Sequence, residues 1–165
     1  MKTYLIDANV LIQAHQTSYP FDVIPSYWKT LKELSQNGVI RSIDKVKMEI
    51  CGHDFEDDLS KWCKTDLDTN FFCDTQDCIK EYSLITQWAM GSTLYTPSAK
   101  SGFLKTDLAD PWLIAYSIKN NCKLVTYEIS DPHRKKSIKI PEPCKVFDVQ
   151  VMHPIDMLRS LNISI

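Results

Sequence analysis

Residues 3–14 read TYLIDANVLIQA, and they carry the first indication of the fold class. Residues 3–6 form a short apolar run typical of a buried β-strand, and Asp7 ends that run. The residues from Asn9 to Ala14 have the pattern of a helix that begins directly afterwards. Because a strand that turns into a helix is the first half of a βαβ unit, this stretch predicts an α/β protein.

The same alternation continues along the chain. Apolar residues at helical spacing predict a helix over 26–36, and residues 39–43 predict a second strand. Parallel strands need long crossovers, so this order favours a mostly parallel sheet with helices on both faces, a three-layer α/β/α architecture in one domain over residues 1–165. The other expected elements are helices over 44–51 (capped by Asp44), around residue 62, and over 79–90, 110–118 and 154–161, strands over 123–127 and 146–149, and loops over 19–25, 96–102 and 132–139.

Composition excludes several protein classes. Of the 165 residues, 44% are apolar and 24% are charged, close to the averages for folded soluble proteins and unlike a disordered chain. The formal net charge is −2, whereas a protein that coats nucleic acid through bulk electrostatics is usually strongly basic. The charge therefore disfavours a structural DNA-binding protein and leaves enzymes open, because a nuclease can rely on a metal ion and a local basic patch.

Six cysteines are spread along the chain, at positions 51, 63, 73, 78, 122 and 144. The N-terminal residues show no signal-peptide pattern, and no apolar run approaches the roughly 18 residues of a membrane span. We therefore expect a soluble cytoplasmic protein with reduced thiols. Four zinc ligands at standard spacing cannot be assembled from these cysteines and the histidines.

Several acidic residues fall where a parallel sheet would bring them together. Asp7 and Glu128 end predicted strands, Glu49 lies on the helix after the second strand, and ligands of open α/β sheets bind at the carboxyl ends of strands. Asp110 begins the helix that precedes the late strand. Each acid alone has an ordinary explanation: Asp7 and Asp110 as helix caps, with Asp107 as a competing cap. Glu49 could be a solvated helix residue and Glu128 a loop acid.

Clustered carboxylates repel one another and raise one another's pKa values. A fold tolerates such a cluster when a cation neutralises it, and a set of oxygen ligands suits Mg²⁺ or Mn²⁺. These ions polarise a phosphodiester, generate hydroxide from water and stabilise the leaving oxygen. The pattern therefore favours a hydrolase of phosphodiester bonds that works without a covalent nucleophile.

Residues 4–11, Glu49, residues 109–115 and residues 124–128 carry a resemblance to a known family. In their order and spacing, the sequence resembles the PIN domains, a fold of metal-dependent ribonucleases that includes VapC-like toxins. Within the PIN domains it is most similar to the branch designated DUF4411. The features shared with that branch are residues 13–15, 19–22, 42–46 and 110–112.

The resemblance implies roles for individual residues. Asp7, Glu49 and Asp110 match the metal-binding carboxylates of PIN domains. Asn9 matches a small polar residue that supports the first Asp through hydrogen bonds. Glu128 matches a fourth metal-binding acid, where most PIN domains carry Asp. The extra methylene moves that carboxylate by about 1.5 Å, which puts the binding of a second metal in question.

Two further residues complete the candidate site. By the same resemblance, Thr126 is a hydroxyl near the site and Asp107 an auxiliary acid.

The activity that the resemblance implies is that of a Mg²⁺- or Mn²⁺-dependent endoribonuclease with RNA as its substrate. It also implies a cognate antitoxin that blocks the acidic cleft, and a homodimeric assembly. The cations that could clamp the phosphate backbone, or form an ordinary solvated loop, are Arg134, Lys135, Lys136 and Lys139.

Two other function classes stay open. A haloacid-dehalogenase-type phosphatase uses an Asp nucleophile and a second Asp two residues later, but Asn9 occupies that second position here. A non-catalytic PIN-like module that binds RNA or a protein would have the same fold, since a fold does not determine a function. A P-loop enzyme is excluded, because the chain has no Gly-rich phosphate loop with its lysine.

Overall fold

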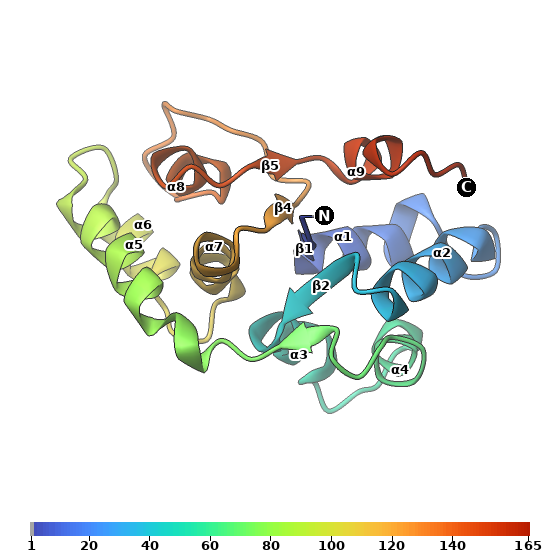
Figure 1. Ribbon diagram of the computed structural model, residues 1–165. Helices are drawn as coiled ribbons and strands as arrows, with labels where there is room; N and C mark the ends of the chain where they lie inside the picture. Colours follow the sequence, from blue (N-terminus) through green and yellow to red (C-terminus); the bar gives the residue numbers. More distant parts are fainter. Residues whose placement is uncertain (1) are drawn as a thin grey trace.

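The centre of the computed structural model, which describes residues 2–165, is a parallel five-stranded sheet in the order β3-β2-β1-β4-β5 (Figure 1). β1 pairs with both β2 and β4, and all three of its residues are buried. Burial on both faces explains why this strand reads as a continuous apolar run. The strands are β1 Tyr4–Ile6, β2 Ile40–Ile43, β3 Phe72–Cys73, β4 Lys123–Val125 and β5 Val151–Met152.

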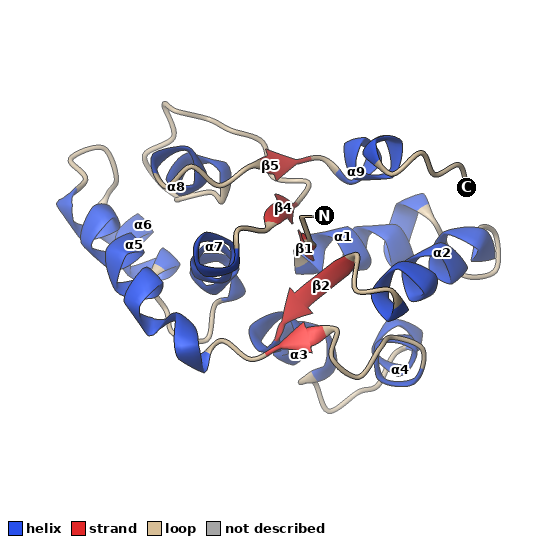
Figure 2. Ribbon diagram, in the orientation of Figure 1, coloured by secondary structure: helices blue, strands red, loops and turns tan. Residues whose placement is uncertain are grey.

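Helices cover the sheet from both sides, so the predicted three-layer α/β/α architecture is confirmed. Figure 2 shows α1, α2 and α9 on one side, and α5, α6, α7 and α8 on the other. Among residues 2–165, every helix is too short or too polar to cross a membrane. The helices are α1 Ala8–Gln13, the π-helix η1 Ala14–Ser18, α2 Pro25–Gln36, α3 Asp44–Cys51, α4 Asp58–Thr65, the 3₁₀ helix η2 Gln76–Cys78, α5 Ile79–Gly91, α6 Pro97–Phe103, α7 Ala109–Asn120, α8 Pro141–Val146 and α9 Pro154–Ser160.

The loop predicted over residues 96–102 is wrong, because this segment forms α6. The Thr96 hydroxyl accepts a hydrogen bond from the Ala99 N–H at 3.2 Å and so caps the helix. Pro97 occupies the first turn, where its missing N–H costs nothing. Both are helix-start signals, and they outweigh the polar composition that suggested a loop.

Two expectations for strands also need correction. Residues 146–149, predicted as a strand, contain the end of α8 and a turn in which Asp148 has φ of 54°. The last strand is instead β5, which starts at Val151. The strand predicted over 123–127 ends at Val125, so Thr126 lies beyond it. Nothing in the pattern of the sequence predicted β3, which has only two residues.

Asp44 starts α3 rather than capping it, since Ile43 holds the cap position. The Asp44 carboxylate accepts hydrogen bonds from the Thr75 hydroxyl at 2.8 Å and the Lys45 N–H at 2.9 Å. Asp44 therefore ties the start of α3 to the segment that follows β3.

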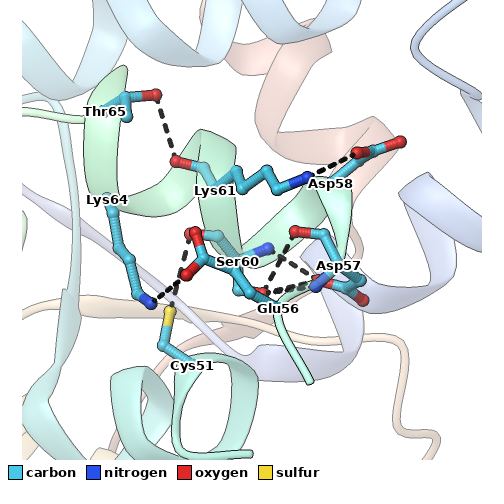
Figure 3. Close-up of polar contacts among 8 residues, drawn as sticks. All are labelled: Cys51, Glu56, Asp57, Asp58, Ser60, Lys61, Lys64 and Thr65. Atoms are coloured by element: carbon cyan, nitrogen blue, oxygen red, sulfur yellow. Dashed lines mark hydrogen bonds and ion pairs between the residues drawn. The ribbon is translucent and has the colours of Figure 1, made fainter. Parts of the chain in front are cut away.

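The connection between α3 and α4 contains several acidic residues (Figure 3). The Asp57 carboxylate accepts a hydrogen bond from the Ser60 N–H at 2.8 Å, and the Asp57 N–H donates to the Ser60 hydroxyl at 3.1 Å. This reciprocal pair is a capping box at the start of α4. Glu56 pairs with Lys64 at 3.1 Å. These acids therefore stabilise α4, which packs against the helix that carries Glu49.

A buried hydroxyl ties β2 to the end of β1. Ser42 is fully buried, and its hydroxyl donates a hydrogen bond to the carbonyl of Ile6 at 2.7 Å, one residue before Asp7. We expect Ser42→Ala to lower the free energy of unfolding by about 1–2 kcal/mol, because a buried carbonyl loses its donor. Urea unfolding followed by circular dichroism measures the change.

The control is Ser83→Ala, which removes an exposed hydroxyl bonded to a carbonyl within α5. It should change the free energy of unfolding by less than about 0.5 kcal/mol. Equal stability of Ser42→Ala and the wild type would show that the buried bond contributes nothing.

Candidate active site

Acidic residues follow the carboxyl ends of three neighbouring strands, which point the same way because the strands are parallel. Asp7 comes directly after β1, Glu128 follows β4, and Glu49 lies on α3, the helix after β2. Asp110 lies in the first turn of α7. The charges of the other three acids all raise the pKa of Asp7, so the fold places them near enough to act on it electrostatically. These four residues are called the carboxylate cluster below.

Asp7 is at the centre of this cluster and only 4% exposed. It holds the N-cap position of α1, but its side chain makes no cap hydrogen bond. Its oxygen Oδ2 instead accepts a hydrogen bond from the Thr126 hydroxyl at 2.7 Å. The geometry therefore rules out helix capping as the role of the Asp7 carboxylate.

Thr126 and Asn9 link the ends of β1 and β4. The Asn9 Nδ2 group donates to the Thr126 hydroxyl at 2.9 Å, and its Oδ1 accepts from the Tyr127 N–H at 3.2 Å. The same hydroxyl accepts from the Glu128 N–H at 3.1 Å. One buried hydroxyl thus orients Asp7 and also holds the backbone that carries Glu128. Thr126 contacts Asp7 directly, whereas Asn9 reaches it only through Thr126 and does not make the direct hydrogen bond to the Asp7 carboxylate that its predicted role described.

Asp107 and Asp110, the two candidate caps of α7, differ in position and in burial. The cap position belongs to Leu108, so neither Asp107 nor Asp110 caps the helix. Asp110 is half-buried and belongs to the cluster, whereas Asp107 is exposed. Asp107, Lys105 and Glu49 share the lining of a cavity of about 390 Å³. Asp107 therefore lies in the surface around Glu49, which is itself the exposed member of the cluster.

Burial and mutual repulsion change the acidity of the cluster. Loss of solvent raises the pKa of Asp7 to about 8, and the charges of Asp110, Glu128 and Glu49 add to this effect. The pKa of Asp110 rises to about 7, mainly through burial and then through Glu128 and Glu49, while Lys139 lowers it. Partial loss of solvent around the carboxyl also raises the pKa of Glu49. Burial therefore disfavours the ionised forms of Asp7 and Asp110, which are called the inner acids below, and shifts their ionisation to around neutral pH and above.

Glu128 differs from the inner acids because its charge is paired. The Lys139 Nζ donates to Oε1 at 2.8 Å, and the Ile140 N–H donates to Oε2 at 2.8 Å. Lys139 was predicted as part of an RNA-binding segment, and the structure places it inside the carboxylate cluster. The sequence shows a lysine in a basic loop, but the direction of its side chain depends on tertiary packing.

The other predicted phosphate-binding cations stay on the surface. Arg134, Lys135 and Lys136 are exposed. The Arg134 Nε lies 3.3 Å from an oxygen of Asp131. These residues present positive charge to solvent on the loop that leaves Glu128 and returns at Lys139. The sequence did not single out Lys105, which lines the cavity beside Glu49. Its one feature that could have drawn attention is its position five residues before Asp110.

Comparison with known proteins identifies the family. The family model described as "Domain of unknown function (DUF4411)" matches residues 4–165. The chain belongs to the DUF4411 family. Among solved structures it is similar to a chain in the crystal structure of VapBC2 from Rickettsia felis bound to a DNA fragment from their promoter. The TM-score is 0.55 at 15% identity, over 92% of this chain and 98% of that one. No curated protein matches the sequence.

These matches confirm the predicted resemblance and the PIN-like fold. At 15% identity, the structural similarity is evidence for the fold alone. What this DUF4411 protein does must therefore be argued from its own side chains.

The donors of the carboxylate cluster are all oxygens, the ligands that Mg²⁺ and Mn²⁺ prefer. In the part of the chain that the structure describes, no three Cys, His, Asp or Glu side chains lie close enough to ligate one ion as they stand. A site with three protein ligands therefore requires a side chain to move. Glu49 can do so, because it is exposed on α3. The chemistry of the donors fits these ions, and a bound cation would stabilise the ionised forms of the two inner acids.

Asp7→Asn should stabilise the metal-free protein at neutral and alkaline pH. The pKa of Asp7 rises from an ordinary 3.8 to about 8 on folding, so folding favours the protonated acid. This contribution to stability is complete below about pH 4 and is lost as the pH rises towards about 8. Asn cannot ionise, so the Tm advantage of the variant should grow by several degrees between about pH 5 and pH 8, since about 1 kcal/mol shifts Tm by about 2–4 °C.

Thermal unfolding in EDTA measures this advantage. Asp54→Asn, a change of the same chemistry at an exposed acid outside the cluster, is the matched control and should follow the wild type at every pH. A constant difference between Asp7→Asn and the wild type across the range would contradict the raised pKa.

Proposed function

We propose that this DUF4411 protein is a metal-dependent endoribonuclease and the toxin of a toxin–antitoxin pair. The observation that carries the proposal is the inner pair of acids, the buried Asp7 and the half-buried Asp110, which raise the cost of each other's ionisation at the carboxyl edge of a parallel sheet. Such a pair is costly for stability, and groups with perturbed pKa values gather at functional sites. A divalent cation bound there explains why the fold keeps both.

Asp7 and Asp110 would hold Mg²⁺ or Mn²⁺, and Glu49 would complete the site by rotating its exposed side chain towards them. Such an ion polarises a phosphodiester and lowers the pKa of a bound water. The protein's own part is orientation: the Thr126 hydroxyl fixes one oxygen of Asp7, and Asn9 fixes Thr126. Outer partners of this kind usually matter almost as much as the ligands.

The surface around the cluster supports RNA as the substrate. The chain is acidic overall, so an RNA phosphate needs local positive charge to approach the carboxylates. Lys105 supplies a cation in the cavity beside Glu49, and Arg134, Lys135 and Lys136 supply others on the loop beyond Glu128. These residues would contact the backbone, and they carry no information about sequence.

The toxin assignment is supported by the fold. The similar solved chain comes from a complex named VapBC2. A free ribonuclease harms the cell that makes it, so the proposal includes an antitoxin that covers the carboxylate cluster. An arginine from that partner would suit the site, because its guanidinium pairs with carboxylates in two-pronged geometry.

Growth of a bacterium after induced expression tests catalysis and toxicity together. At matched protein levels, the wild type should arrest growth, whereas Asp7→Asn and Asp110→Asn should not, because each removes a negative charge that holds the metal while keeping the shape of the side chain. Asp54→Asn is the matched control and should arrest growth as the wild type does.

Arrest by all four proteins would contradict catalysis and point to toxicity through binding. Continued growth with the wild type would contradict the toxin role. Circular dichroism of the purified variants checks that each one is folded.

A further inference from the structure

The Glu128 end of the carboxylate cluster already holds a cation. Both carboxylate oxygens of Glu128 are engaged, one by the Lys139 ammonium and one by the Ile140 N–H, each at 2.8 Å. The Glu128 side chain is 15% exposed and the Lys139 side chain 37% exposed, so the carboxylate is largely withdrawn from solvent and the ammonium is half-buried. Charge-assisted hydrogen bonds of this kind are stronger than those between neutral groups.

The backbone around Lys139 is anchored. The next residue, Ile140, is fully buried. Glu142 in α8 accepts hydrogen bonds from the Ser130 hydroxyl at 2.6 Å and the Asp131 N–H at 2.8 Å, which ties the beginning of the basic loop to the helix at its end. The backbone that carries Lys139 is therefore held in place, and its ammonium is held by the hydrogen bond to Glu128.

The charge of the Lys139 ammonium also affects the acidity of Asp110, a second member of the cluster. It lowers the pKa of Asp110, whereas Glu128 and Glu49 raise it. Two-metal phosphodiesterases place their ions about 3.5–4 Å apart between carboxylates. A fixed positive charge among the same carboxylates repels a second divalent ion and leaves it without the Glu128 ligand.

We propose that the Lys139 ammonium takes the place of a second divalent ion, so that this chain binds a single Mg²⁺ or Mn²⁺ ion. The inference rests on the proposed metal site. It assigns Asp7, Asp110 and Glu49 to the ion and assigns Glu128 to Lys139. The Glu128 carboxylate then holds an ammonium rather than a metal ion.

Counting bound Mn²⁺ tests this assignment without any RNA. Isothermal titration of the full-length wild-type chain should give one Mn²⁺ per molecule. Lys139→Met keeps most of the apolar stem but removes the charge, so it releases Glu128 and should give two. Lys139→Arg keeps a cation and should give one. Lys135→Ala removes an exposed lysine from the same loop, and it should also give one.

Lys139→Gln is the second neutral variant, in case Lys139→Met does not fold, and it should also bind two ions. Thermal unfolding checks the folding of each protein. Two Mn²⁺ ions in the wild type, or one in a folded neutral variant, would overturn the proposal while leaving the metal site intact. Failure of the wild type and the neutral variants to bind Mn²⁺ at all would overturn the proposed metal site, and this inference with it.

Discussion

Asp7 places a carboxylate at the end of a strand that is buried on both faces, and β1 cannot shift without losing its pairing with β2 and β4. The position of this charge is therefore set by the sheet. The Thr126 hydroxyl donates to it and Asn9 holds that hydroxyl, whereas burial and the charges of Asp110, Glu128 and Glu49 raise its pKa to about 8. A cation bound as we propose would offset this cost.

The cluster divides into two electrostatic halves. Asp7 and Asp110 form the inner half, where burial raises both pKa values. Glu128 forms the outer half, where Lys139 and the Ile140 N–H satisfy both oxygens. The proposed count of one metal ion follows from this division, because Lys139 already supplies a positive charge to Glu128.

The acids of the site could be predicted from sequence because local patterns place them. Asp7 ends an apolar run, and Asp110 and Pro111 lie in the first turn of α7, so strand and helix signals locate them in the chain. Lys139 could not be placed in this way, because a loop side chain points wherever tertiary contacts direct it. For the same reason β3 was missed: its two residues have too little pattern, and pairing with β2 defines the strand.

The chemistry of the RNA ends distinguishes metal-activated hydrolysis from cleavage by the RNA 2′-hydroxyl. Water activated at a metal site attacks phosphorus and leaves a 5′-phosphate or a 3′-phosphate, whereas ribonucleases that use the RNA 2′-hydroxyl pass through a 2′,3′-cyclic phosphate. The account predicts that purified wild-type protein with Mg²⁺ or Mn²⁺ cuts single-stranded RNA to linear phosphate ends from the first product onward, and that EDTA or Asp110→Asn abolishes cutting. Cyclic phosphate ends, or cutting that persists in EDTA, would contradict it.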